Sequence, residues 1–592
     1  MQTADYLIVL FYLVLVTTIG ITFRKKSSKN LSAYFLGNRK LPWWLLGISG
    51  MVSNTDVTGT MINIAMVYAF GTMGFFIEIR GGVVLILAFL LVFMGKWNRR
   101  SKVMTVPEWM FFRFGKNKQG EMARLVSAVS TLVLAVVMVS YFIIGIGKFA
   151  GMLLHVNPRM VSFIIIIIVT GYTIIGGFFG VVWTNFFQGF IIFTAIFYLG
   201  FIAFYQVDIP KEIITSIPLE KGTQVTTIPY NTWTQLLPSF NAPVPGKFSM
   251  YASFGWLLLF YLFRTSLDGF GGPRGYVAQR FFAAKNDREA GLLTLLWMFL
   301  LSFRWFLIAA VALLGIYYNA SHFVIEDPEL VLPQVISHYL PVGLKGLVVA
   351  ALLGAAVATF DSYVNAQASI WVKDIYQLYC KPKASGQQLI KQARLATALL
   401  VVAGLSVSLT VSNIIDIWGW ITIGLGGGIF IPNVLRWYWW RLNGYGFSIG
   451  IFSGLVAALV AKWALKDLPE YYVFFLSSGF SLAGCIAGAY LTSATPVKVL
   501  ANFYTVTRPF GFWNIVKKDL TIENRKSIVK ENNKDLLSLL LALPFQLSLF
   551  LLGMMVAFRR WDNVLVLSII LIGLFIGLYF IWYRRLEKEK KP

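Results

Sequence analysis

Charged residues are scarce in this chain of 592 residues: Asp, Glu, Lys and Arg together make up 13%, whereas apolar residues make up 57%. Soluble globular domains carry about a quarter charged residues. A soluble fold with about half that share would expose large apolar patches and aggregate. The composition therefore excludes an ordinary soluble protein and indicates that the lipid bilayer is the solvent.

Cysteine is nearly absent, and the two that occur, Cys380 and Cys485, lie in or beside apolar runs. They provide neither a disulfide framework nor metal-ligand spacing. A Walker loop, a kinase motif block and a Gly-x-Ser-x-Gly elbow are also missing from any credible context. These absences argue against an enzyme and against ATP-driven transport.

Long apolar runs, by contrast, follow one another along almost the whole chain. A helix needs about 20 apolar residues to cross a hydrocarbon core of about 30 Å, and these runs lack the alternation of barrel strands. We therefore predict an all-α polytopic membrane protein with about 15 transmembrane helices. The predicted spans are residues 4–23, 44–70, 73–95, 122–153, 160–179, 183–206, 249–270, 290–318, 342–375, 389–411, 416–440, 446–465, 470–491, 535–558 and 561–584.

Basic residues outnumber acidic ones, 51 to 26, which gives a net charge of +25. If the spans alternate in direction, most basic loops fall on one side, which the positive-inside rule makes cytoplasmic. The pair Arg559-Arg560 is an exception. This topology predicts a plasma or inner membrane protein with its N-terminus outside and its C-terminus in the cytoplasm, where anionic lipid attracts the basic tail. The charge then requires no nucleic-acid partner.

Two predicted spans contain helix-breaking stretches at mid-membrane depth. Residues 49–60 are largely polar, and residues 268–275 hold four glycines around Pro273. Carriers commonly bind ions and substrates where membrane helices unwind. Because the two broken spans begin successive sets of five spans, they enter the membrane from opposite faces, as in an inverted repeat.

The span boundaries divide the chain into seven predicted parts. In order, these are an N-terminal extra helix with a cytoplasmic loop (1–43), a first five-helix repeat (44–206), an exterior loop (207–248), a second five-helix repeat (249–441), two extra helices (442–491), a basic cytoplasmic segment (492–534) and two C-terminal helices (535–592). The basic segment is expected to contain a helix on the membrane surface.

Several spaced motifs resemble those of the sodium/solute symporter family, which includes proline, sugar and sialic-acid carriers. They are residues 42–49 (PWWLLGIS), 105–109 (TVPEW), 113–115 (RFG), 176–177 (GG), 182–185 (VWTN), 188–189 (QG), 279–280 (QR), 283–285 (AAK), 361–362 (DS) with Asn365, and 374–376 (DIY). The resemblance covers about residues 5–445. It implies a LeuT-type 5+5 inverted repeat with extra flanking helices, alternating access and coupling to sodium.

The resemblance also implies a sodium site. Its carbonyl ligands correspond to Val52, Thr55 and Ala355, and its pair of hydroxyl ligands corresponds to Ala358 and Thr359. One hydroxyl is therefore missing. Since sodium is held by several hard oxygen ligands, the site is expected to be weaker or to use a replacement ligand.

A neighbouring second cation site is the candidate source of the replacement ligand. Asp361 and Ser362 correspond to two serines of a second sodium site in the sialic-acid branch, and the aspartate that completes it there corresponds to Asn185. We hypothesise that the carboxylate has moved between neighbouring helices, so that Asn185, Asp361 and Ser362 hold a cation. The alternative is that Asp361 forms a salt bridge with an arginine for packing alone.

Substrate contacts are expected among charged, polar and aromatic residues near the midplane, where charge is costly unless it has a function. The candidates are Asn54, Asp56, Glu78, Phe270, Arg274 and Arg304. By the resemblance, Glu78 takes the place of a carboxylate that contacts sugar hydroxyls, and Phe270 the place of an aromatic gate. The arginines suit an anionic substrate, or they neutralise Glu78 and Asp268 for a neutral sugar-like solute, or the charges form a structural network.

The sequence thus predicts a sodium-coupled symporter of a small polar solute, such as a sugar, a sugar acid or another organic anion. Sodium is the one ion expected, and no obligate protein partner is evident. Because Ala358 lacks a hydroxyl, two alternatives stay open: a transporter-like sensor or partner subunit, and a proton-coupled or uncoupled carrier.

Overall fold

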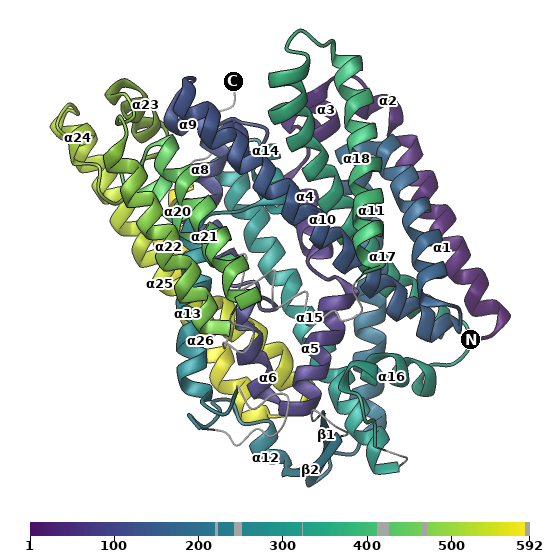
Figure 1. The fold of residues 1–592 in the computed structure, drawn as a ribbon. Coiled ribbons are helices and arrows are strands. Elements are labelled where there is room, and N and C mark those ends of the chain that lie inside the picture. The colour runs from purple at the N-terminus through teal and green to yellow at the C-terminus, as the bar shows by residue number, and fades with distance from the viewer. Residues whose placement is uncertain (219–222, 242–250, 322–323, 411–425, 465–469, 587–592) are drawn as a thin grey trace.

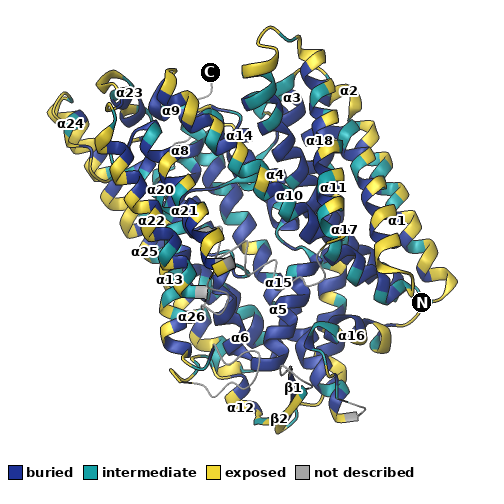
Figure 2. Ribbon diagram, in the orientation of Figure 1, coloured by how far each residue is buried: buried dark blue, intermediate teal, exposed yellow. Residues whose placement is uncertain are grey.

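The computed structural model describes the chain except residues 219–222, 242–250, 322–323, 411–425, 465–469 and 587–592. Long helices run side by side between two ends of the molecule (Figure 1). Within the described residues, ten helices are long and apolar enough to cross a membrane. Apolar side chains cover the outward faces of the outer helices α1 (Thr3–Thr22) and α26 (Trp561–Ile581) (Figure 2). The protein is a multi-pass membrane protein.

The first repeat begins with a broken helix. Helix α4 (Trp43–Ser53) ends at mid-depth, and α5 (Val57–Phe70) continues after an interruption at residues 54–56. The next span is made of short pieces: α6 (Thr72–Ile77), a 3₁₀ turn (Glu78–Arg80), α7 (Ile86–Phe89), a π-helical turn (Leu90–Met94) and α8 (Gly95–Arg100). Helices α9 (Val106–Phe114), α10 (Lys118–Leu154) and α11 (Pro158–Gln206) follow.

Helix α11 is two helices joined by a reversal at Gly177. This glycine has φ +53° and ψ −157°, a conformation that is essentially restricted to glycine. Tyr172 and Gln188 interact with each other across the reversal, although a straight helix would hold them about 24 Å apart. The two arms correspond to the predicted spans 160–179 and 183–206.

The second repeat begins with the other broken helix. Helix α13 (Phe254–Gly271) stops at residues 272–274, and α14 (Gly275–Ala283) resumes. Helices α4 and α14 lie toward one end of the molecule, and α5 and α13 toward the other (Figure 1), so the two broken helices run in opposite directions. The repeat continues with α15 (Asp287–Ser321), α17 (Leu344–Ile370, extended by π-helical turns Trp371–Cys380), α18 (Gly386–Ser408) and α20 (Gly426–Tyr438).

The predicted eleventh span, 416–440, is described only from residue 426, because its first part lies outside the described residues. Helices α15 and α17 are the most deeply buried of the long helices and form the centre of the bundle (Figure 2).

One end of the molecule carries a small β-hairpin, and we call it the hairpin end. Strands β1 (Glu212–Pro218) and β2 (Thr223–Pro229) pair antiparallel, and the short helices α12 (Tyr230–Trp233) and α16 (Val331–Tyr339), with the 3₁₀ turn Pro328–Leu330, lie beside them (Figure 1). The hairpin was not expected in the segment 207–248, which the sequence predicts to be an exterior loop. Its strands are rich in Ile, Thr and Val, which favour extended structure.

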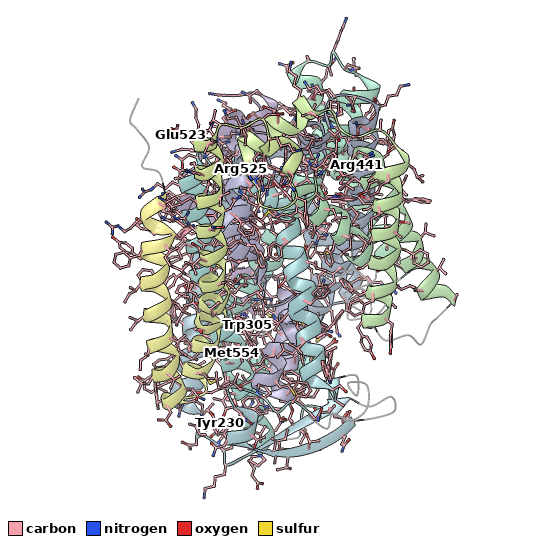
Figure 3. All side chains as sticks on the ribbon, turned by 90° about the vertical axis from the view of Figure 1, so that its left-hand side faces the viewer. Tyr230, Trp305, Arg441, Glu523, Arg525 and Met554 are labelled. Atoms are coloured by element: carbon pink, nitrogen blue, oxygen red, sulfur yellow. The ribbon has the colours of Figure 1, made fainter. Side chains whose placement is uncertain are left out.

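The opposite end, which we call the α9 end, carries α2 (Arg24–Ser27), α3 (Leu31–Leu36), the 3₁₀ turn Gly37–Arg39, α9, α14, α23 (Val497–Thr507) and α24 (Asn514–Lys517). Figure 3 shows Arg441, Glu523 and Arg525 at this end and Tyr230 at the other. Helices α21 (Gly444–Ala464), α22 (Glu470–Leu491) and α25 (Ile522–Ala557) complete the bundle, and α26 ends in the 3₁₀ turn Tyr583–Arg585.

The basic segment 492–534 folds against the repeats at the α9 end. Phe503 of α23 packs edge-on against Trp109 of α9, with ring centroids 5.4 Å apart. Glu531, in the first turns of α25, accepts from Lys96 at 2.8 Å and from Arg100 at 3.0 Å. Helix α25 therefore begins well before residue 535, where the predicted span starts.

Candidate functional site

The interruption between α4 and α5 is fixed by side chains that satisfy the exposed backbone. Asp56 caps α5, because its carboxylate accepts from the Gly59 amide at 2.7 Å. The Thr55 hydroxyl donates to the Met51 carbonyl at 2.9 Å and the Thr60 hydroxyl to the Asp56 carbonyl at 2.7 Å. A short polar run thus ends one helix and starts the next inside the bundle.

Helix α17 lies along this interruption. The Ser53 hydroxyl is 2.8 Å from the Ser362 hydroxyl and donates to the Ala358 carbonyl at 3.3 Å. The Thr359 hydroxyl donates to the Ala355 carbonyl at 3.0 Å. The segments that carry the five expected sodium ligands, Val52 and Thr55 on one side and Ala355, Ala358 and Thr359 on the other, are therefore neighbours in a fully buried region.

The three residues of the expected second cation site are brought near one another, but their side chains diverge. Asn185 and Ser362 face the same group of oxygens as Ser53, with the Asn185 amide 3.0 Å from the Ser53 hydroxyl and 3.3 Å from that of Ser362. Asp361 instead accepts a hydrogen bond from Tyr172 at 3.0 Å. Its other oxygen lies 3.4 Å from the Ser362 hydroxyl.

A cavity of about 100 Å³ adjoins the interruption. Four of the expected substrate residues, Asn54, Asp56, Glu78 and Arg304, line it together with Thr359. Arg304, which is 3% exposed, lies 3.9 Å from Asp56 and donates to the Thr60 hydroxyl at 3.2 Å. Glu78 pairs with Arg80 at 3.0 Å. Each carboxylate at this cavity therefore has a guanidinium beside it.

A second cavity of about 340 Å³ continues from the first. The two share Asn54, Gly81 and Tyr276 among their lining residues. The larger one extends along α10 and α20 as far as Val106, the first residue of α9, and so points toward the α9 end. Arg274 lines it and pairs with Asp268.

Phe270 lines neither of these two cavities. Its ring packs against Phe89 and Tyr438, with centroids 5.0 and 5.9 Å apart. The structure therefore assembles four of the six expected substrate residues at the small cavity, places Arg274 at the larger one and leaves Phe270 outside both.

The sodium:solute symporter family model matches residues 34–454, most of the chain. The chain belongs to the sodium:solute symporter family. It is 26% identical over 491 residues to sodium/glucose cotransporter 4 of Danio rerio, covering 78% of this chain and 72% of that one. It is 24% identical over 505 residues to the high-affinity proline transporter of Bacillus subtilis, covering 81% and 97%.

The fold of this symporter agrees with a solved structure. A sodium-coupled sialic acid symporter in a substrate-bound, outward-open state superimposes with a TM-score of 0.66 over 84% of this chain and 99% of the other, at 19% sequence identity. The expected LeuT-type 5+5 inverted repeat is thus confirmed.

Some residues at the symporter's cavity were not anticipated. Tyr141, Asn63 and Tyr276 line the small cavity, and the buried Asn63 amide nitrogen and Asn54 amide oxygen have no hydrogen-bond partner among the described residues. Asn63 had a signal in the sequence, since it is a lone amide in an apolar stretch. Tyr141 had none, because aromatic residues are common throughout these helices.

Proposed function

We propose that this chain is a sodium-coupled symporter that carries a small, neutral, polyhydroxylated solute by alternating access. The observation that supports it is the small cavity beside the interrupted helix, which is lined by both acidic and basic side chains. Asp56 and Glu78 are balanced there by Arg304 and Arg80, so the charges around the cavity cancel. A neutral solute requires no net charge from its site, whereas an organic anion would favour an excess of guanidinium groups.

In this proposal sodium binds at the carbonyls of Val52, Thr55 and Ala355 and at the Thr359 hydroxyl. Thr359 also lines the small cavity, so ion and solute occupy adjoining positions. Sodium binding stabilises the arrangement in which α4 and α17 lie together, and the solute then docks on the Asn54 amide and the Glu78 carboxylate. Coupling follows because the two ligands favour the same state.

The direction in which the larger cavity opens supports a carrier. The larger cavity leads from the small one to the α9 end, where Arg441 and Arg525 lie (Figure 3). We assign this end to the cytoplasm by the positive-inside rule, which places the hairpin end and the N-terminus outside. The described state is then open inward, with Arg274 and Arg264 along the exit path.

Uptake into proteoliposomes tests the proposal. Purified protein would be reconstituted and given an inward sodium gradient with radiolabelled hexoses, polyols, proline and sugar acids, each against an equal potassium gradient. We expect sodium-dependent uptake of a hexose or polyol. Uptake of proline or of sugar acids alone would overturn the substrate class, and a proton gradient that replaces sodium would overturn the coupling ion.

The alternative of a sensor or partner subunit makes a different prediction in the same assay. A sensor would bind solute and change its thermal stability without accumulating it. Accumulation of any solute against its gradient excludes that alternative.

A further inference from the structure

A groove of about 970 Å³ lies at the α9 end, and none of its described lining residues belongs to the two cavities described above. Three walls form it: α9 with the start of α10, the π-helical turns that extend α17, and α23 of the basic segment 492–534. At one edge, a Cβ atom on Gly115 would lie only 3.2 Å from a methyl group of Val499. The groove therefore joins both repeats to a segment that the proposed transport mechanism does not use.

Basic side chains make up most of the charge in this groove, which we call the basic groove. The charged residues among its described lining are Lys116, Arg124, Lys373, Lys498 and Glu108. Arg124 is buried and pairs with Asp374 at 2.7 Å. Lys373 lies 3.8 Å from Glu108. Two of the four basic side chains are thus compensated by carboxylates of the protein itself.

The other two basic side chains, Lys116 and Lys498, carry charges that the protein does not compensate. Neither ammonium group has an ion pair or a hydrogen bond with a residue that the structure describes, and both lysines are exposed. Lys116 follows Gly115 and Lys498 precedes Val499, so the two lysines flank one contact between the loop before α10 and α23. Like charges on either side of one contact favour the binding of an anion, which relieves their repulsion.

The basic groove also has an apolar part that continues onto the surface that faces lipid. Phe112 and Leu378 line it. Beside it, Met122 and Leu125 of α10 are 40% and 38% exposed, and Val497 of α23 is 43% exposed. Helix α10 is long and apolar enough to cross a membrane, so its exposed apolar side chains are covered by acyl chains in a bilayer. The groove therefore lies where a headgroup layer meets the chains.

We propose that the basic groove binds an anionic phospholipid, with its phosphate at Lys116 and Lys498 and its chains along the apolar surface of α10. Lysine binds phosphate as a point charge, and basic residues at the cytoplasmic surface attract anionic lipid. A soluble anion would use the lysines and leave the apolar part uncovered. The proposal rests on the proposed function only for the side of the membrane. It gives the segment 492–534 a role, because α23 supplies one wall of the lipid site.

Thermal unfolding in detergent tests this without sodium or solute. The purified full-length chain would be titrated with phosphatidylglycerol in mixed micelles, and with phosphatidylcholine of the same chains. We expect phosphatidylglycerol alone to raise the unfolding temperature, in proportion to the logarithm of its concentration. Lys116→Gln/Lys498→Gln should raise half-saturating phosphatidylglycerol by about 30-fold. The control Lys526→Gln/Lys530→Gln removes the same charge from exposed positions of α25 that do not line the groove, and should leave it unchanged.

Each other outcome would overturn the proposal. Equal shifts with both lipids would show that the phosphatidylglycerol headgroup is not recognised, and an equal loss in the control variant would attribute binding to the general charge of this end. Glycerol phosphate or inorganic phosphate that reproduces the shift at the same concentration would replace the lipid by a soluble anion. Polyglutamate that binds more tightly than phosphatidylglycerol would replace it by an acidic protein segment. Uptake assays that show no sodium-dependent transport, with lipid binding as expected, would overturn the proposed function and leave the basic groove in place.

Discussion

Thr359 carries the hydroxyl that remains of the expected pair at the sodium site, and its removal is the sharpest test of that site. Thr359→Val keeps the branched shape and removes the oxygen, whereas Thr359→Ser keeps the oxygen and removes a methyl group. In the structure the hydroxyl is buried, donates to the Ala355 carbonyl at 3.0 Å and borders the small cavity. The hydroxyl hydrogen is therefore used in the bond to Ala355, and the oxygen lone pairs remain to coordinate a sodium ion.

The expected magnitude follows from the number of ligands. With Ala358 at the neighbouring position, Thr359 supplies the side-chain oxygen and the carbonyls of Val52, Thr55 and Ala355 supply the rest. Losing one oxygen contact to a charged group costs about 1.5–3 kcal/mol, which corresponds to a rise of about 10- to 150-fold in half-saturating sodium. The reverse change, Ala358→Ser, adds the missing hydroxyl and is expected to lower half-saturating sodium by about tenfold.

Two assays report the sodium affinity. Initial uptake rates in proteoliposomes give half-saturating sodium once a transported solute is known. The sodium-dependent rise in unfolding temperature gives it without one, because a ligand that binds the folded state stabilises it in proportion to the logarithm of its concentration. Unchanged sodium dependence in Thr359→Val would refute the assignment of Thr359 as a ligand. A shift of the same size in Thr359→Ser would attribute the effect to packing.

Three further predictions address the cavity, the fold and the orientation. Asp56→Asn leaves the buried Arg304 without its carboxylate and should lower the free energy of unfolding by about 3 kcal/mol, measured by thermal unfolding. The double variant Asp56→Asn/Arg304→Gln should restore stability but not uptake. Gly177→Ala should cost about 1–3 kcal/mol because of its backbone conformation, whereas Gly171→Ala, at an open position in the same helix, should be neutral. The exposed Cys380 should react with a membrane-impermeant maleimide in inverted vesicles and not in intact cells, and the opposite pattern would refute the orientation.

Local chemistry made the broken helices predictable. Residues 49–60 and 268–275 interrupt helices because of their own polar side chains, glycines and proline, and the interruptions fall within those ranges, at 54–56 and 272–274. The reversal at Gly177 lies near the C-terminal end of the predicted span 160–179, a few residues before the predicted boundary between the two spans. Such features depend on a few adjacent residues, so a sequence is enough to locate them.

The orientation of side chains around a helix was harder to predict. Asp361 and Ser362 are consecutive, and consecutive residues on a helix point about 100° apart, so their side chains meet different neighbours. Ser362 shares a face with Ala358, four residues earlier, and meets Ser53, while Asp361 turns to Tyr172. Phe270 lies outside both cavities for the same kind of reason, because the rotation of α13 is set by its neighbours.

Arg280 was visible in the sequence as half of a Gln-Arg motif, but its contacts depend on the length of its side chain. An arginine side chain spans several ångströms, so its charged group contacts helices other than the one that carries it. No spacing rule in the sequence connects residue 280 to residues 49, 53 and 362. The contacts became apparent only once α14, α4 and α17 were placed together.

The position of Arg280 bears on how ion and solute movements are linked. Ser53 lies between Val52 and Thr55 of the proposed sodium site and is also the nearest oxygen to Arg280, at 2.7 Å. Any motion that separates α4 from α17 must therefore also break the contacts of Arg280 with Ser49 and Ser53 on one side or with Ser362 on the other. Arg280 belongs to α14, the continuation of the other broken helix, so the same motion displaces both broken helices.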